Sequence, residues 1–138
     1  MSSPIPATKN LHLTVITPSR AVLSADASAL VAPAFDGEVG VLPGHAPMLA
    51  LLGNGELRVN ATDGKLRRLA IRGGFMQVAD NKVTVLTPES CSPEDLKSAD
   101  FAAESEKLNA QHPVKLEERE ALENQKAWLK LKEKIRAQ

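Results

Sequence analysis

Residues 36–48 read Asp-Gly-Glu-Val-Gly-Val-Leu-Pro-Gly-His-Ala-Pro-Met, and this is the most restricted stretch of backbone in the chain. Three of its thirteen residues are glycine and two are proline. Glycine permits positive φ or a close backbone approach, whereas proline fixes φ and removes a hydrogen-bond donor. We therefore predict a loop with one defined path, which presents Glu38 and His45 to a partner, rather than a flexible linker.

Short runs of strand-forming residues surround this loop. They cover residues 11–17, 27–34, 56–61, 66–72, 75–79 and 82–87. Asp63-Gly64 and Asp80-Asn81 separate successive runs and are typical of hairpin turns. Many short strands with few helical windows predict a β-sandwich or a flattened barrel. Aromatic residues are scarce, so the predicted core is aliphatic, with Phe35 and Phe75 as its aromatic members.

The chain changes character at residues 88–92, because all eight glycines lie between Gly37 and Gly74. Beyond this point Ser92-Pro93 resembles a helix start, since serine caps a helix and proline fits the first helical position. We predict one helix from there to Leu108 and a second from Pro113 to Arg136. The predicted fold is α+β. Residues 1–88 form an antiparallel β-sandwich, and residues 89–138 form a linker and an antiparallel two-helix hairpin.

Both predicted helices have an apolar face. In the second helix Ala121, Trp128 and Ile135 recur every seven residues, with Leu122, Leu129 and Leu131 beside them. The first helix has a narrower face of Leu96, Ala99 and Ala103, bordered by Phe101 and Leu108.

The charge on the second helix is polarised, with acidic residues in its first half and basic residues in its last. The basic residues are Lys126, Lys130, Lys132, Lys134 and Arg136. They are either a solvated face that complements the helix dipole or a basic tip that binds an acidic partner.

Composition excludes several classes of function. The 17 basic and 17 acidic residues balance, so no overall field draws the chain to nucleic acid or to an anionic membrane. The single cysteine, Cys91, allows no internal disulfide and no multi-cysteine metal site, which predicts a reducing, cytoplasmic compartment. The spacing of His12, His45, His112 and Cys91 matches no metal-ligand pattern, and we find no cofactor motif.

The stretch Glu38-Val-Gly-Val-Leu-Pro-Gly-His-Ala-Pro47 resembles the Gly-x-x-Pro-Gly-His-Ala-Pro segment of one protein family, the epsilon subunits of bacterial and plastid F-type ATP synthases. Their mitochondrial counterpart is called delta. Ile71-Arg-Gly-Gly-Phe75, followed by Val83-Thr-Val-Leu86, is similar to a second segment of that family. The resemblance covers nearly the whole chain.

This resemblance implies a non-catalytic subunit of the rotary central stalk, on the cytoplasmic face of the bacterial plasma membrane. The sandwich would bind the gamma subunit and the c-ring, with Glu38 and His45 as c-ring contacts. The hairpin would fold against the sandwich or extend into the alpha/beta catalytic hexamer, where it restrains ATP hydrolysis. The five basic residues of the last helix would then face an acidic loop of the beta subunit. Membrane contact would come only through the complex, and the chain would need no cofactor or metal.

One segment departs from the family pattern. Some members bind ATP through Ile/Leu-Asp-x-x-Arg-Ala, whereas this chain has Leu96-Lys-Ser-Ala-Asp-Phe101. Lys97 replaces the acid and Asp100 replaces the arginine. Because Asp100 would repel a triphosphate, we predict no physiologically useful ATP binding.

Two other classes of protein fit part of the pattern. A separate β-sandwich binding module with a helical dimerisation arm would share the patterning, and co-purification with a gamma-like subunit would exclude it. A small hydrolase would need a nucleophile, a base and a group that orients the base, and the sequence offers no such set.

Overall fold

The computed structural model describes residues 10–97 and 100–137. The first nine residues of the predicted unit 1–88, Ser98 and Ala99 of the predicted first helix, and Gln138 lie outside the described residues. The strands are β1 (Leu11–Ile16), β2 (Ala21–Ala34), β3 (Gly37–Val41), β4 (Met48–Ala61), β5 (Leu66–Ala79), β6 (Lys82–Leu86) and β7 (Ser90–Cys91). A 3₁₀ turn η1 (Glu94–Leu96) and the helices α1 (Phe101–Asn109) and α2 (Leu116–Arg136) follow.

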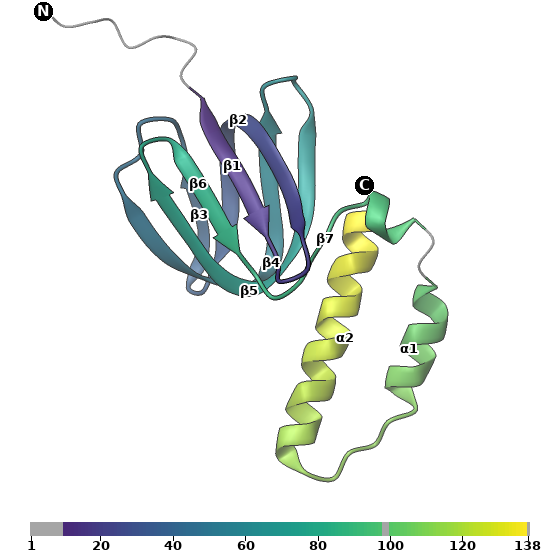
Figure 1. Ribbon diagram of the computed structural model, residues 1–138. Helices are drawn as coiled ribbons and strands as arrows, with labels where there is room; N and C mark the ends of the chain where they lie inside the picture. The colour runs from purple at the N-terminus through teal and green to yellow at the C-terminus, as the bar shows by residue number, and fades with distance from the viewer. Residues whose placement is uncertain (1–9, 98–99, 138) are drawn as a thin grey trace, which may run out of the picture.

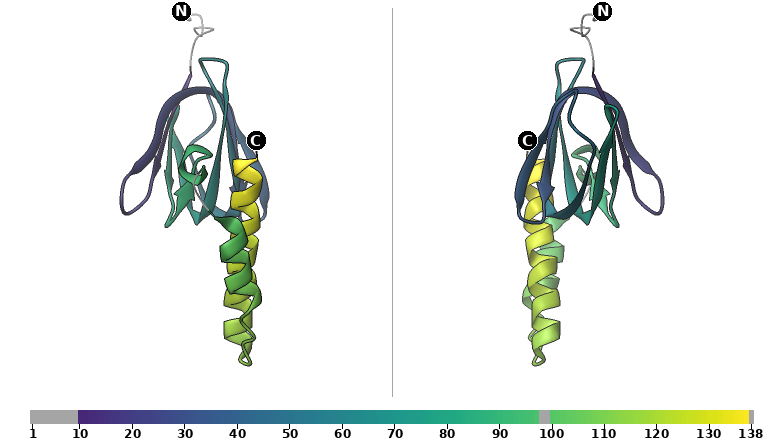
Figure 2. Two further views of the ribbon diagram at one scale, coloured as in Figure 1. Left: turned by 90° about the vertical axis from the view of Figure 1, so that its right-hand side faces the viewer. Right: turned by 90° about the vertical axis from the view of Figure 1, so that its left-hand side faces the viewer.

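The strands form a sheet that closes on itself. Their order is β1-β6-β5-β4-β2-β3, and β1 also pairs with β2, which joins the first strand to the far side of the sheet. All pairings are antiparallel except that of β1 with β6. The strands arch over and form two facing layers (Figures 1 and 2). The predicted α+β fold, a sandwich followed by two helices, is confirmed.

The core follows from alternation along the strands. Leu11, Leu13 and Val15 are fully buried, whereas His12 is exposed. Aliphatic side chains of both layers fill the space between them, as the sequence predicts. The prediction for the two phenylalanines is wrong, because Phe35 is 75% exposed and Phe75 is 52% exposed.

Three strands are longer than the sequence indicates. β2, β4 and β5 each have 14 residues, because each bends and continues from one layer into the other. The predicted runs 66–72 and 75–79 are therefore one strand, bent at Gly73 and Gly74, which both have positive φ. The stretch 36–48 is also only partly a loop, since residues 37–41 form β3 along the edge of β2.

The helices form an antiparallel pair beside one end of the sandwich (Figure 1). The prediction of a first helix beginning at Ser92-Pro93 is wrong: α1 begins at Phe101, because Asp100 has non-helical dihedral angles and accepts a hydrogen bond from the Ala103 amide as its N-cap. Of the predicted small-residue face, Leu96 is buried and Ala103 is exposed, while Ala99 lies outside the described residues. Within the described ranges, neither helix is long and apolar enough to cross a membrane.

Candidate partner-binding surfaces

The loop after β3 holds His45 in a turn closed by local hydrogen bonds. The His45 amide donates to the Leu42 carbonyl at 3.1 Å, and Nδ1 lies 2.7 Å from the Ala46 carbonyl oxygen. A carbonyl only accepts, so Nδ1 carries the proton of this bond. Nε2 makes no hydrogen bond with any described residue, and it is the ring atom left for a partner.

Glu38 lies on β3 with its side chain 57% exposed. Its carboxylate is 2.9 Å from the Arg58 guanidinium, which reaches across from β4. The sequence shows no cation near Glu38, because the two residues are brought together only by the pairing of β2 with both strands. An exposed ion pair of this kind contributes about 0–1 kcal/mol, so Glu38 can exchange Arg58 for another partner. Among the described residues, no hydrogen bond or ion pair joins Glu38 to His45.

The basic residues of α2 are mostly engaged within the molecule. Lys126 lies 4.0 Å from Glu123 on the same helix, and Lys132 lies 3.8 Å from Glu104 on α1. Lys134 is 3.8 Å from Glu56 on β4, while Arg136 stacks over the Phe101 ring at 4.2 Å. Lys130 is exposed and has no ion pair among the described residues. The basic end of α2 is therefore the end that lies against the sandwich, and the free end of the hairpin is the turn between the helices (Figure 1).

A second apolar cluster joins the hairpin to the sandwich. Trp128, Leu129 and Ile135 of α2 pack with Ala70 of β5, and Leu96 and Phe101 complete the cluster. Ile135 is fully buried, and the Arg72 guanidinium lies 5.7 Å from the centre of the Trp128 ring. The predicted stripe of α2 is confirmed apart from Ala121, which is exposed. Two buried polar atoms of this interface, Glu56 Oε2 and Trp128 Nε1, have no hydrogen-bond partner among the described residues.

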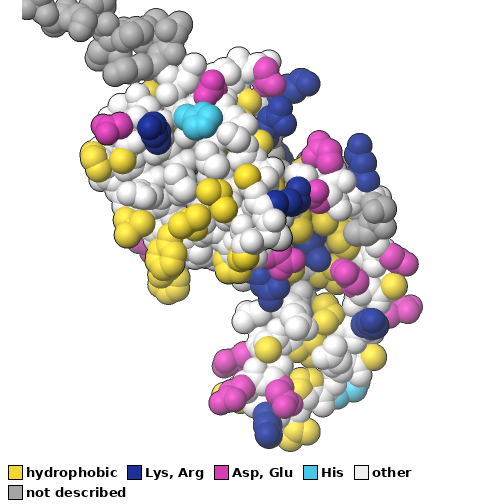
Figure 3. All heavy atoms as spheres, in the orientation of Figure 1, with side chains coloured by type: hydrophobic (Ala, Val, Ile, Leu, Met, Phe, Trp, Pro, Cys, Tyr) yellow, Lys and Arg dark blue, Asp and Glu magenta, His cyan; other side chains and the backbone are white. Residues whose placement is uncertain are grey.

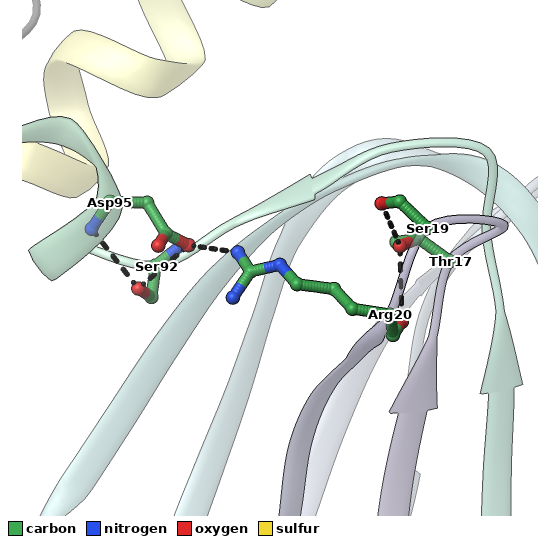
Figure 4. Close-up of polar contacts among 5 residues, drawn as sticks. All are labelled: Thr17, Ser19, Arg20, Ser92 and Asp95. Carbon is green, nitrogen blue, oxygen red and sulfur yellow. Dashed lines mark hydrogen bonds and ion pairs between the residues drawn. The ribbon is translucent and has the colours of Figure 1, made fainter.

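A polar contact ties η1, at the start of the helical segment, to Arg20 in the turn between β1 and β2 (Figure 4). Asp95 Oδ2 accepts hydrogen bonds from the Ser92 amide and hydroxyl at 3.0 Å, and from the Arg20 guanidinium at 2.9 Å. Burial raises the pKa of Asp95, but the bonds from Ser92 and Arg20 outweigh burial and hold that pKa below its usual value. The contact thus joins the turn between β1 and β2 to η1.

An apolar row on the sandwich was not predicted from the sequence; it consists of Ile16, Phe35, Leu51, Phe75 and Leu86. Cross-strand pairing aligns Ile16 with Leu86, Leu86 with Phe75, and Phe75 with Leu51. The Phe35 amide then donates to the Leu51 carbonyl at 2.8 Å, which brings Phe35 alongside. Figure 3 shows hydrophobic side chains gathered along this end of the sandwich. The row borders an apolar hollow of 430 Å³ beside Pro18.

The bend at Gly73 and Gly74 explains why this row was missed. Before the bend Leu69 and Ile71 face the core between the layers, and after it Met76 and Val78 do, so the positions that face this core change from odd to even numbers. Phe75 is thereby turned outward. The signal was present in the sequence as the Gly-Gly pair, because such pairs mark bends or bulges in strands.

The segment that departs from the family's ATP-binding pattern is also described in part. Lys97 is exposed, and Asp100 is the N-cap of α1, 3.1 Å from the Ala103 amide. Ser98 and Ala99 lie outside the described residues. Asp100 therefore has a local structural use that an arginine cannot replace, because arginine offers no acceptor.

Comparisons with known proteins agree on one family. The family model described as "ATP synthase, Delta/Epsilon chain, beta-sandwich domain" matches residues 10–92. The ATP synthase epsilon chain of Pelotomaculum thermopropionicum is 45% identical over 91 residues, which are 66% of this chain and 67% of that one. The epsilon chain of Alkalilimnicola ehrlichii is 38% identical over 117 residues, 85% of this chain and 76% of that one. The match to a Nitratidesulfovibrio vulgaris epsilon chain spans only 65% of that protein's length.

Solved structures extend the likeness to the helices. A chain of the Euglena gracilis mitochondrial ATP synthase, solved as OSCP/F1/c-ring in rotational state 1, superposes with a TM-score of 0.65 at 26% identity, over 83% of this chain and 78% of that one. A chain of the Tetrahymena thermophila mitochondrial ATP synthase central stalk and c-ring also has a TM-score of 0.65, at 21% identity, over 91% of this chain and 96% of that one. At 21% identity, the similarity to the Tetrahymena thermophila chain shows a shared fold only.

Proposed function

Because this chain belongs to the delta/epsilon family of ATP synthase, we propose that it is a non-catalytic rotor subunit of the central stalk, which couples rotation of the gamma subunit to the c-ring. Residues 1–88 would bind gamma and the c-ring, and residues 89–138, the linker and helical hairpin, would regulate ATP hydrolysis. As a peripheral subunit it would act at the cytoplasmic face of the bacterial plasma membrane and reach that membrane only through the complex.

The observation that carries this proposal is the apolar row. Phe35, Leu51, Phe75 and Leu86 are each at least 50% exposed, although side chains of this size are usually buried. A contiguous exposed apolar surface marks an interaction site. We assign this surface to gamma. A rotor subunit must bind gamma tightly, and burial of apolar area stabilises such a complex.

The polar residues Glu38 and His45 suit a different contact. We assign them to the polar loops of the c-ring, as the resemblance implies. The ion pair of Glu38 with Arg58 is partly exposed to solvent, and His45 Nε2 makes no hydrogen bond with any described residue. Both can therefore bind polar groups at little cost in lost internal contacts.

Glu38→Ala tests the c-ring contact. We expect ATP-driven proton pumping to fall in vesicles that contain the reconstituted complex, while the thermal unfolding of the isolated subunit changes little. Glu94→Ala is a matched control, since Glu94 is an exposed carboxylate on η1, away from β3. Unchanged pumping in Glu38→Ala would remove this residue from the c-ring contact.

The hairpin is proposed to restrain ATP hydrolysis by the alpha/beta hexamer. α2 has 21 residues and is roughly 32 Å long, enough to reach from a stalk into a hexamer. Its basic residues would bind an acidic surface there. In the structure described above, the hairpin lies against the sandwich, and we call this arrangement the compact form. There Lys132, Lys134 and Arg136 contact residues of α1 and β4 instead, so the two sets of contacts compete.

The compact form is poised for such competition, because its interface is imperfectly matched. Each buried polar atom without a hydrogen bond costs about 1–3 kcal/mol, and this interface has two, on Glu56 and Trp128. Lys134 offsets little of the Glu56 cost, since it is 64% exposed and lies at 3.8 Å, beyond hydrogen-bonding distance. A small difference in free energy between two arrangements is what a switch requires.

Removal of the hairpin tests this regulation. A chain that ends after Cys91 keeps β7, which pairs with β5 and completes the sandwich edge. We expect the complex with this shorter chain to hydrolyse ATP faster than the complete complex and to synthesise ATP at a similar rate. Equal hydrolysis with both chains would exclude the hairpin as a brake.

Nucleotide would play no part in this regulation. We expect calorimetric titration of the full chain with ATP to give no measurable heat of binding at micromolar concentrations. Micromolar affinity would contradict the argument from Lys97 and Asp100.

A further inference from the structure

The turn between β5 and β6 holds the loop that carries His45. Asp80 and Asn81 form this turn, with φ of 50° and 63°. The Asn81 side-chain oxygen, Oδ1, accepts a hydrogen bond of 2.7 Å from the Gly44 amide. The Asn81 carbonyl also accepts one of 2.8 Å from the His12 amide, at the start of β1. One residue therefore fastens the loop to the closed end of a hairpin and to the first strand.

No other residue in the ranges 10–97 and 100–137 bonds to this loop from a distance. The bonds of His45 are to Leu42 and Ala46, within the loop itself, and they fix its shape but not its position on the sandwich. The Asn81 bond spans 37 positions in sequence and meets the loop at Gly44, next to His45. Gly44 has φ of 86°, a conformation that suits glycine. The local turn closed by the bond between the His45 amide and the Leu42 carbonyl therefore sets the direction of the Gly44 amide.

We propose that Asn81 is a positioning residue for the His45 loop. Glycine would satisfy the left-handed conformation at position 81, but only a side chain with an acceptor oxygen can also hold Gly44. By fixing Gly44, Asn81 sets the direction in which the adjacent imidazole is presented. The functional part of this inference rests on the proposed c-ring contact, whereas the anchoring itself does not.

Two substitutions separate the acceptor from the turn. Asn81→Gly keeps positive φ accessible and removes the acceptor, while Asn81→Asp keeps an acceptor oxygen in a residue that tolerates the same conformation. Asp80→Gly is the matched control, because Asp80 lies in the same turn with positive φ and is exposed. His45→Ala reports what the loop contributes to the complex.

The first measurement is hydrogen exchange of the Gly44 amide in the full chain, followed by NMR. We expect exchange about three- to tenfold faster in Asn81→Gly, from the loss of one hydrogen bond, and close to the original rate in Asn81→Asp and Asp80→Gly. Unchanged Gly44 exchange in Asn81→Gly would overturn the inference.

The second measurement is ATP-driven proton pumping by the reconstituted complex. We expect Asn81→Gly to lower pumping, Asn81→Asp to restore it, and Asn81→Gly to have little further effect in a His45→Ala background. If His45→Ala lowers pumping and Asn81→Gly does not, the positioning role is wrong. If Gly44 exchange rises in Asn81→Gly but neither substitution changes pumping, the proposed c-ring contact fails while the anchoring by Asn81 is supported.

Discussion

At the scale of single residues, Gly73 and Gly74 determine which side chains of β5 face the core. Both have positive φ, but their surroundings differ. A Cβ at Gly74 would overlap the Leu86 carbonyl oxygen on β6, whereas one at Gly73 would have no atom closer than 3.8 Å. Gly74 is thus required twice, for its conformation and for the closeness of the neighbouring strand.

The paired substitutions Gly73→Ala and Gly74→Ala test this difference. We expect Gly73→Ala to cost about 1–2 kcal/mol of unfolding free energy from backbone strain alone. Gly74→Ala should cost more than about 3 kcal/mol, because β6 must also move. Urea denaturation of both variants measures the two costs. Equal costs would mean that the Leu86 backbone yields without penalty.

Asp95 predicts a dependence of stability on pH. Its folded pKa lies below the usual value of 3.8, so its contribution is present above that value and is lost as the pH falls through the folded pKa. We expect Asp95→Asn to lower stability at neutral pH by up to about 1 kcal/mol, discounted for exposure. The difference should shrink as the pH falls below 3.8 and the Asp95 carboxylate becomes protonated. Chemical denaturation at several pH values measures it, with exposed Glu94→Gln as the control. A difference that persists in acid would contradict the assignment.

Residue types located the candidate polar contacts but not their partners. Glu38 and His45 follow from the glycine and proline spacing around them. The contact of Arg58 with Glu38 and that of Asn81 with Gly44, beside His45, could not be predicted. These pairs are 20 and 37 positions apart in the chain, and only strand pairing brings their members together.

At the scale of elements, the sequence located most strands and both helices but misplaced several ends. The predicted runs 11–17 and 82–87 each exceed their strands by one residue. α1 begins eight residues later than Pro93, because the side chain of Asp100 competes with continued helix by capping α1. Periodicity reports which face of an element is apolar, while local side-chain hydrogen bonds decide where it starts.

The docking of α2 gives an element-scale prediction. Ile135 is fully buried against the sandwich. We therefore expect Ile135→Ala to reduce the free energy that holds α2 against the sandwich by about 2–4 kcal/mol. Cys91 reports the change, because burial, followed by the nearby Glu89 carboxylate, raises the pKa of its thiol and keeps it poorly reactive. We expect alkylation of Cys91 to be at least about tenfold faster in Ile135→Ala.

Leu116→Ala is the matched control for that experiment. It truncates a side chain of similar size on the same helix, but Leu116 is 70% exposed. Its alkylation rate should equal that of the original chain. Equal rates in both variants would show that the docking of α2 does not protect Cys91.

At the scale of the whole molecule, the apolar row and the hairpin occupy separate surfaces. Gamma binding should therefore be separable from regulation. We expect Leu51→Ser and Phe75→Ser to weaken binding to gamma by roughly 10- to 100-fold while the subunit stays folded, because these side chains are already half exposed. Pull-down with purified gamma measures the effect. Leu66→Ser is the control, since Leu66 is 49% exposed and pairs with Asn60, away from the row. Retained binding in both variants would place gamma elsewhere.

The closed sheet was predictable as a class, but its closure was not. Alternating runs and hairpin turns indicate a sandwich or barrel, yet the parallel pairing of β1 with β6 joins strands about 70 residues apart in sequence. The same holds for the contact between Lys134 and Glu56, which depends on how the hairpin folds back. Long-range closure depends on the sum of many weak contacts, which no single motif records.

The three 14-residue strands give the sandwich a mechanical property that suits a rotating shaft. β4 and β5 run side by side for nearly their whole length, and their hydrogen bonds lie across the strand direction. A pull along the strands therefore loads these bonds together in shear, rather than peeling them apart one by one. If the subunit transmits torque as proposed, the sandwich should deform little under that load, because β2, β4 and β5 each run without a break through both layers.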